Sequence, residues 1–213
     1  MTDPHQPDET TGRGRKPMLL FAGLAAALVA ALVIAPYADG VLQRLSSQVA
    51  MDAAIGGPFT LVDHRGKPFT ETDLTGRPAL LFFGFTHCPD VCPTTLQAMS
   101  GWLADLGQDG DAVRAIFVTV DPGRDTPAAI AAYLGAFDQR IIGLTGTPEQ
   151  VAAMLKVYRV YSKKVDMGGG DYAVDHSSAV YLMDVSGKFW SVIAMNEPRA
   201  GAVAKLKKLI HGG

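Results

Sequence analysis

The two cysteines of this chain, Cys88 and Cys92, follow directly after the continuous apolar run 79–83. Such a run is typical of a strand that is buried on both faces. A helix is predicted over 93–106, so its start lies close to the cysteines. If the helix begins near the first cysteine, the four-residue spacing places both sulfurs on one helical face, about one turn apart. Backbone N–H groups and the dipole at this helix end favour thiolate over thiol, so the pair can form a disulfide or bind a soft metal ion.

Strand-like and helix-like segments alternate along the rest of the chain. We predict strands at 59–62, 79–83, 115–120, 178–183 and 189–195, and helices at 93–106, 127–137, 147–158 and 198–210. The dipeptides Thr126-Pro127 and Thr147-Pro148 are typical helix starts, with Thr as N-cap and Pro in the first turn. The glycine-rich segment 167–170 predicts a loop. This order predicts an α/β, thioredoxin-like domain over 57–213, in which helices flank a central mixed sheet.

A second apolar run, 18–35, contains no charged residue. At helical rise it spans roughly 27 Å, close to the thickness of the hydrocarbon core of a bilayer. Arg13, Arg15 and Lys16 precede the run, so the positive-inside rule places the first 17 residues in the cytoplasm. We therefore predict a cytoplasmic disordered tail over 1–17, one N-terminal transmembrane helix as anchor over 18–36 and a linker over 37–56. This topology favours the bacterial inner membrane, with the C-terminal domain in the periplasm.

A cleaved signal peptide is the alternative interpretation of the run 18–35. The run is longer than the ~7–15 apolar residues that are usual in such peptides. Its best small-residue site, 33–35, is followed by Pro36. The formal net charge of -2 favours no nucleic acid as a partner.

A permanent disulfide between Cys88 and Cys92 is the structural alternative for the pair, because periplasmic thiols tend to be oxidised. A loop this short would add little stability, since the loop-closure entropy grows with loop length. A domain of this size also buries most of its surface without covalent cross-links.

Metal binding by the cysteine pair depends on a third ligand. Zinc prefers four ligands, whereas Cu(I) accepts two or three, with thiolate favoured and imidazole acceptable. His176 lies in a predicted loop that leads into the strand 178–183, from which a distant ligand can reach the cysteines. Spacing alone leaves it open as a ligand or as a surface residue. The other histidines are less suited by position: His5 in the tail, His64 in a turn, His87 pointing away from the sulfurs, and His211 near the C-terminus.

The stretch 83–93, Phe-Gly-Phe-Thr-His-Cys-Pro-Asp-Val-Cys-Pro, resembles the signature of the Sco/SenC family of copper-binding cytochrome c oxidase assembly proteins. The segments 120–127, 143–146, 156–161 and 174–177 also resemble the family, in the family's order, so the resemblance covers most of 57–213. It implies a thioredoxin-like fold that binds one copper ion, as Cu(I) or Cu(II), through Cys88, Cys92 and His176.

The same resemblance implies a membrane-anchored copper chaperone that helps to metallate CuA, the binuclear copper centre in subunit II of cytochrome c oxidase. The implied partners are that subunit, a copper donor protein and a thioredoxin-like reductant that keeps the pair reduced. We expect no turnover of small molecules. One alternative is a thiol–disulfide oxidoreductase that reduces the target cysteines, with Cys88 attacking and Cys92 resolving. A peroxidase-like enzyme is the other.

Charged residues near the predicted site have two interpretations each. Asp121 and Arg124 follow the strand 115–120, where they tune the site or dock a partner. Equally, Arg124 and Asp125 form an ion pair or a helix cap in this loop. Asp175 orients His176 as a hydrogen-bond acceptor, or is simply solvated. Met167, beside the glycines, is at most a weak additional ligand.

Overall fold

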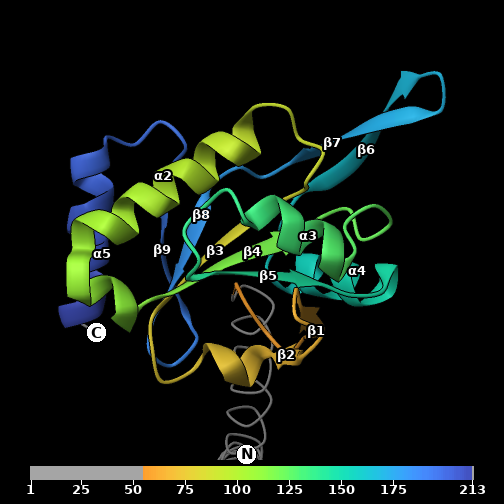
Figure 1. Ribbon diagram of the computed structural model, residues 1–213. Coiled ribbons are helices and arrows are strands. Elements are labelled where there is room, and N and C mark those ends of the chain that lie inside the picture. Colours follow the sequence, from red (N-terminus) through yellow and green to blue (C-terminus); the bar gives the residue numbers. More distant parts are fainter. Residues whose placement is uncertain (1–54, 213) are drawn as a thin grey trace, which may run out of the picture. The chain divides into compact units, whose positions relative to one another are not determined.

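The computed structural model describes residues 55–212, in which a mixed sheet is flanked by helices (Figure 1). The strands are β1 (Thr60–Asp63), β2 (Pro68–Thr70), β3 (Ala79–Gly84), β4 (Arg114–Thr119), β5 (Ile141–Thr145), β6 (Ser162–Gly168), β7 (Asp171–His176), β8 (Val180–Met183) and β9 (Phe189–Ile193). The helices are α2 (Val91–Leu106), α3 (Pro127–Leu134), α4 (Pro148–Val157) and α5 (Arg199–His211), with short 3-10 helices η1 (Glu71–Leu74) and η2 (Gly107–Ala112).

The tail and anchor predicted over 1–17 and 18–36, and nearly all of the linker over 37–56, lie outside the described residues. Among residues 55–212, no helix has the length and apolar character that a membrane span requires.

Seven strands form the main sheet in the order β2-β1-β5-β4-β3-β8-β9. Strands β3, β4 and β5 run parallel to one another, and the remaining pairs are antiparallel. All six residues of β3 are buried, and strands pair with it on both sides. The prediction of a mixed sheet with this apolar run near its centre is confirmed.

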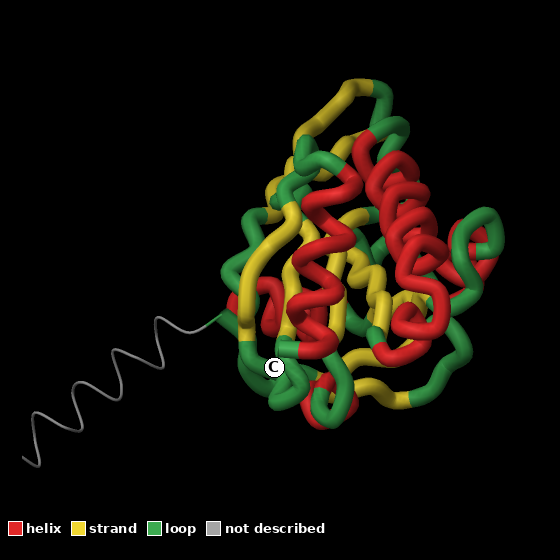
Figure 2. The backbone as a smooth tube through the Cα atoms, turned by 90° about the vertical axis from the view of Figure 1, so that its left-hand side faces the viewer, coloured by secondary structure: helices red, strands yellow, loops and turns green. Residues whose placement is uncertain are grey.

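The two faces of the sheet are covered by different helices, because successive side chains of a strand point to opposite faces. Phe82 and Phe117 pack together on the face that also holds Tyr133 of α3. Phe83 points the other way and contacts Tyr158, directly after α4. Figure 2 shows the helices running alongside the strands, and α5 packs against α2.

The four predicted helices are present, and both predicted caps are formed. The hydroxyl of Thr126 accepts a hydrogen bond from the backbone N–H of Ala129 at 3.2 Å. Thr147 and Gln150 form a reciprocal capping box at the start of α4. Helix α3 ends at Leu134, three residues earlier than predicted.

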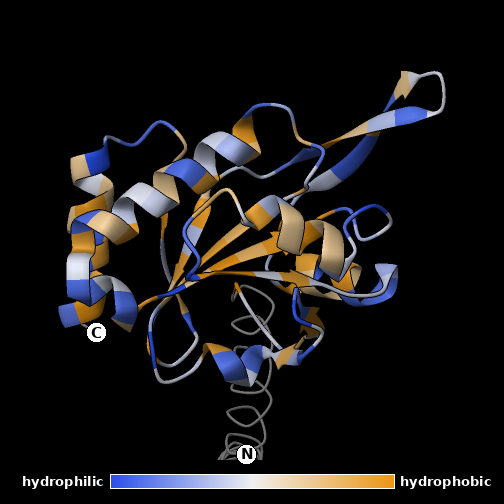
Figure 3. Cartoon of the chain, viewed as in Figure 1, coloured by the Kyte–Doolittle hydropathy of each residue, from blue (hydrophilic) through white to orange (hydrophobic). Residues whose placement is uncertain are grey.

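Strands β2, β5, β6 and β7 are absent from the elements predicted above. β6 and β7 form a separate two-stranded sheet, a hairpin that projects from the main sheet in Figure 1. Met167 and Gly168 belong to β6, so the predicted loop over 167–170 is partly wrong. Gly168, Gly169 and Gly170 all have positive φ, which explains why glycines occupy the turn. The hairpin is far more hydrophilic than the central strands (Figure 3).

Candidate metal centre

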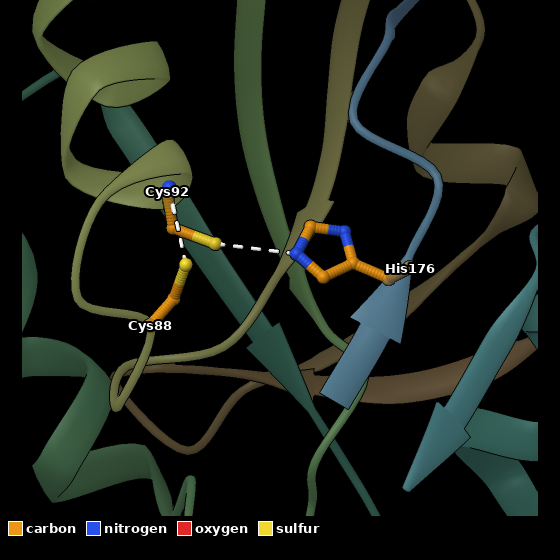
Figure 4. Close-up of side chains that lie close together, drawn as sticks. All are labelled: Cys88, Cys92 and His176. Atoms are coloured by element: carbon orange, nitrogen blue, oxygen red, sulfur yellow. Dashed lines mark hydrogen bonds between the residues drawn. The ribbon is translucent and has the colours of Figure 1, made fainter. Parts of the chain in front are cut away.

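Three potential metal ligands meet at the carboxyl end of β3. The sulfurs of Cys88 and Cys92 and a ring nitrogen of His176 all lie within 4.8 Å of one another (Figure 4). In the part of the chain that the structure describes, this is the one such group of three. The segment between β3 and α2 provides Cys88, the first turn of α2 provides Cys92, and the distant strand β7 provides His176.

Only Cys92 is part of a helix, because α2 begins at Val91 and Cys88 lies in the loop before it. The start of the helix nevertheless lies against Cys88. The backbone N–H of Cys92 donates to the Cys88 sulfur at 3.4 Å. The N-terminus of α2 thus presents a hydrogen-bond donor to that sulfur.

The two cysteines differ in exposure, and both are free thiols. Cys88 is partly exposed, whereas Cys92 is 0% exposed. Burial raises the pKa of the Cys92 thiol well above its ordinary value, and the backbone of Phe85 opposes this only in part. Cys88 is therefore the sulfur that a second protein can reach.

Gly84 allows the Cys92 sulfur to lie directly against β3. A Cβ atom on this glycine would come within 2.8 Å of that sulfur and within 3.0 Å of the Phe117 ring. Real Cβ atoms essentially never approach a heavy atom so closely. The glycine is thus needed for close packing and not for an unusual φ.

His176 is the last residue of β7 and not part of a loop, which corrects the prediction above. Its Nε2 lies 3.4 Å from the Cys92 sulfur. Its Nδ1 lies 2.9 Å from the backbone carbonyl oxygen of Ser177, which can only accept, so Nδ1 carries the ring proton. The lone pair of Nε2 is then directed at the cysteines, ready to bind a metal ion.

Asp175 is exposed on the hairpin, so the acceptor that orients His176 is the Ser177 carbonyl and not this carboxylate. The imidazole is also held by two aromatic rings. Phe82 and Phe85 contact it edge to face, with ring centroids 6.3 and 5.8 Å away. Neither phenylalanine was predicted as a site residue, although Phe85 lies within the signature stretch 83–93.

Asp125 fixes the loop that carries Cys88. This carboxylate is 0% exposed and accepts hydrogen bonds from the Thr86 backbone N–H at 3.1 Å and the Thr86 hydroxyl at 2.6 Å. The hydroxyl of Thr119 donates to it at 2.7 Å. Asp125 thus joins the end of β4 to the cysteine loop, and Thr126, not Asp125, caps α3.

Arg124 forms an ion pair with Asp121 and not with Asp125, so the interpretation of Arg124 and Asp125 as an ion pair is wrong. Asp121 is 0% exposed and also accepts a hydrogen bond from the Tyr172 hydroxyl at 2.8 Å. The Arg124 guanidinium lies 3.8 Å from the centroid of the Tyr172 ring and 5.7 Å from that of Phe85. These contacts join the hairpin to the loop after β4, and no sequence pattern marked Tyr172.

The remaining candidates lie outside the three-ligand group. His87 is exposed and has Nδ1 3.0 Å from the Thr86 hydroxyl. His64 accepts a hydrogen bond from the Gly143 N–H through Nδ1. Met167 is 66% exposed, near the hairpin tip.

The donor set suits a soft ion of low coordination number. Two thiolates and one neutral imidazole leave tetrahedral zinc one ligand short, but they satisfy Cu(I). The same two thiols, free and close together, can also exchange with a disulfide of another protein. The geometry fits both kinds of chemistry.

Comparison with known proteins identifies relatives with this architecture. Residues 47–211 match the family model SCO1/SenC. The mitochondrial protein SCO2 of Saccharomyces cerevisiae is 42% identical over 161 residues, which are 74% of this chain and 54% of that protein. The chain thus spans little more than half the length of the first curated relatives it matches.

Solved structures show the same fold. Bradyrhizobium japonicum ScoI with copper bound is 49% identical, with a TM-score of 0.70, over 74% of this chain and 100% of that one. A second structure is that of BsSco, a member of the Sco family of cytochrome c oxidase assembly proteins in which a disulfide switch was identified. It is 26% identical, with a TM-score of 0.59, over 73% of this chain and 93% of that one. The chain has the thioredoxin-like fold of these proteins and belongs to the SCO1/SenC family.

Proposed function

We propose that the chain binds one copper ion through Cys88, Cys92 and His176. The observation that carries this proposal is the meeting of three suitable ligand atoms, within 4.8 Å, from two segments that are 84 positions apart. The Ser177 carbonyl sets the imidazole tautomer that exposes Nε2, and the buried position of Cys92 shields the ion from solvent. The copper bound by the related ScoI supports the choice of metal.

The ion is cargo that the protein delivers to the CuA centre in subunit II of cytochrome c oxidase. The description of BsSco as a cytochrome c oxidase assembly protein supports this role. The partly exposed sulfur of Cys88 is the atom at which transfer begins, because a thiolate of the partner can approach it while Cys92 and His176 still hold the ion. A copper donor protein loads the site, and a thioredoxin-like reductant restores the two thiols.

Reduction of the target cysteines is the second candidate function, favoured by the unequal burial of the two thiols. The Cys88 thiolate attacks a disulfide of the target and forms a mixed disulfide, while one target thiolate leaves. Cys92 then loses its proton and attacks the Cys88 sulfur, which releases the second target thiolate. Two electrons pass to the target, and Cys88 and Cys92 become a disulfide.

For location, we propose a single-pass protein of the bacterial inner membrane. The apolar run 18–35 forms the anchor and the basic residues before it stay in the cytoplasm, so the described domain lies in the periplasm. The 49% identity to a bacterial ScoI supports a bacterial setting. Retention of the intact N-terminus in the membrane fraction, measured by mass spectrometry, tests the anchor against a cleaved signal peptide.

Copper content of the purified chain tests the three-ligand site. The full-length protein is reduced, loaded anaerobically and compared with His176→Ala and His87→Ala. His87→Ala is the matched control, because it removes an exposed imidazole next to Cys88 in sequence. We expect one copper per chain in the wild type and the control, and much weaker retention in His176→Ala. Equal retention in all three would remove His176 from the site and favour the oxidoreductase.

A second test separates the two functions in cells. Cys88→Ser should abolish CuA assembly under either hypothesis, since the residue is both ligand and nucleophile. His176→Ala should abolish copper delivery but spare thiol–disulfide exchange. Oxidase assembly that survives Cys88→Ser would contradict both proposals.

A further inference from the structure

Four arginines gather at the end of the sheet that is opposite the cysteines. They line a pocket of about 340 Å³, together with Asp111 and Gln139. The four are Arg65, Arg77, Arg114 and Arg140. The metal centre follows the carboxyl end of β3, whereas this pocket lies at the amino ends of the parallel strands. It is therefore independent of the site already described.

The parallel register explains why these positive charges are neighbours. Arg77 lies two residues before β3, Arg114 is the first residue of β4, and Arg140 immediately precedes β5. The Arg114 backbone N–H donates to the carbonyl of Pro78 at 2.9 Å, which places the first two side by side. Like charges on adjacent strands repel one another and are destabilising unless something compensates them.

Of the four guanidinium groups, only that of Arg140 forms ion pairs with carboxylates in the described part of the chain. Arg140 pairs with Asp138 at 2.7 Å and with Asp111 at 3.0 Å. Within residues 55–212, no ion pair involves Arg65, Arg77 or Arg114. The pocket thus carries an excess of positive charge.

Backbone carbonyls hold two of these side chains in place without neutralising them. Arg77 Nη1 donates to the carbonyl of Asp111 at 3.1 Å, and Arg114 Nη1 donates to the carbonyl of Thr75 at 3.0 Å. Burial and the charge of Arg77 lower the pKa of Arg114, and the carboxylate of Asp73 opposes this only in part. Each guanidinium has five N–H donors, so several donors are left to face the pocket.

We propose that this pocket binds a phosphate-type oxyanion. Guanidinium groups match the geometry of phosphate oxygens and bind them through paired, charge-assisted hydrogen bonds. A pocket of this size admits one phosphate group with a small substituent, either as a free ion or as the headgroup of an anionic phospholipid. Binding relieves the repulsion among three neighbouring strands, and it takes place away from the sulfurs.

The experiment uses the full-length chain, purified in a neutral detergent, and two probes. The first measurement is a calorimetric titration of the protein with inorganic phosphate. For the second, the detergent is removed, and binding of the protein to phosphatidylglycerol vesicles is compared with its binding to phosphatidylcholine vesicles. The test variant is Arg77→Gln with Arg114→Gln. The control is Lys163→Gln with Lys207→Gln, which removes the same charge from exposed positions outside the pocket. Circular dichroism and copper content confirm that both variants are folded.

Affinity for phosphate should fall at least about tenfold in the arginine variant and stay unchanged in the lysine control, since charge-assisted contacts are lost only in the former. If the arginine variant and the lysine control differ in binding to phosphatidylglycerol vesicles but not in binding to inorganic phosphate, the lipid headgroup is the source of the phosphate group. The proposal is overturned if neither probe binds the wild type, or if both variants lose binding equally, because general surface charge then explains the attraction.

Discussion

The Tyr172 hydroxyl donates a hydrogen bond to the buried carboxylate of Asp121 at 2.8 Å, which connects the β6–β7 hairpin to the loop after β4. The ring of the same tyrosine lies under the Arg124 guanidinium at 3.8 Å. His176 ends the strand that contains Tyr172, so this contact holds the imidazole-bearing hairpin against the rest of the domain.

Replacement of Tyr172 should therefore loosen His176. Tyr172→Phe removes the hydrogen bond and keeps the stacking on Arg124, whereas Tyr172→Ala removes both. We expect the hairpin to be destabilised by about 1–3 kcal/mol in Tyr172→Ala and by less in Tyr172→Phe. Hydrogen exchange across β6 and β7, and the rate of copper loss to a chelator, measure the effect. Tyr161→Phe, at a 58% exposed tyrosine, is the control, and an equal effect there would argue against the proposed role.

The high pKa of buried Cys92 makes copper binding depend on pH. Its thiol is protonated throughout the neutral range and must lose that proton to bind the ion. Release of the Cys92 proton should raise the affinity by about tenfold per pH unit between about pH 7 and pH 8. A competition titration, corrected for protonation of the chelator, measures this slope. A flat profile would mean that Cys92 binds as a thiol or is not a ligand.

Gly84→Ala should disturb both the fold and the site. The added methyl group meets the Cys92 sulfur and the Phe117 ring, and over-packing of this kind costs about 1–3 kcal/mol. Urea denaturation gives the loss of stability, and copper content gives the effect on the site. Gly123→Ala is the control, because its Cβ would have no heavy atom closer than 3.7 Å. If both variants unfold at the same urea concentration, the close contact is relieved at little cost.

Loss of the Asp125 carboxylate should free the cysteine loop. Asp125→Ala leaves the Thr86 N–H and two hydroxyl groups without their acceptor, at a cost of about 3 kcal/mol. We expect faster alkylation of Cys92 in this variant, because the loop that covers it becomes mobile. Asp175→Ala removes an exposed carboxylate that does not touch His176, and it should leave the alkylation rate unchanged.

Tyr133 provides a prediction about alkaline stability. Its hydroxyl oxygen is buried without a hydrogen-bond partner in the described part of the chain, and burial raises the pKa of the phenol. Above about pH 10 the unfolded chain ionises this group while the folded chain does not, so stability falls as the pH rises. Tyr133→Phe should remove this contribution. Urea denaturation at about pH 8 and about pH 11 checks it, and an unchanged pH dependence would contradict the assignment.

The central part of the fold was predictable because its signal is local. The apolar run of β3 and the two Thr-Pro helix starts each point to a single structure. Strand β5 was missed because Gly143 interrupts a short run, although its lack of a Cβ is what admits Ile130 and Leu134 of α3.

The hairpin was missed for a different reason. Most of β6 and β7 is exposed, so burial imposes no apolar alternation on their sequence. Its position depends on contacts with residues about 50 positions away, such as that between Tyr172 and Asp121, which no local pattern encodes. The orientation of His176 by the Ser177 carbonyl is equally invisible in sequence, because any residue supplies a carbonyl.

The hairpin belongs to a sheet of its own, and this separation affects how a bound ion can leave. His176 can swing away without breaking any hydrogen bond of the seven-stranded sheet, whereas both sulfurs stay fixed beside the core. Once a thiolate of the partner has bound the ion beside Cys88, the imidazole can therefore leave while both sulfurs remain bound. The coordination number of the ion need never drop below three during the exchange. Transfer of the ion to the partner can therefore be rapid even when the ion is bound tightly at equilibrium.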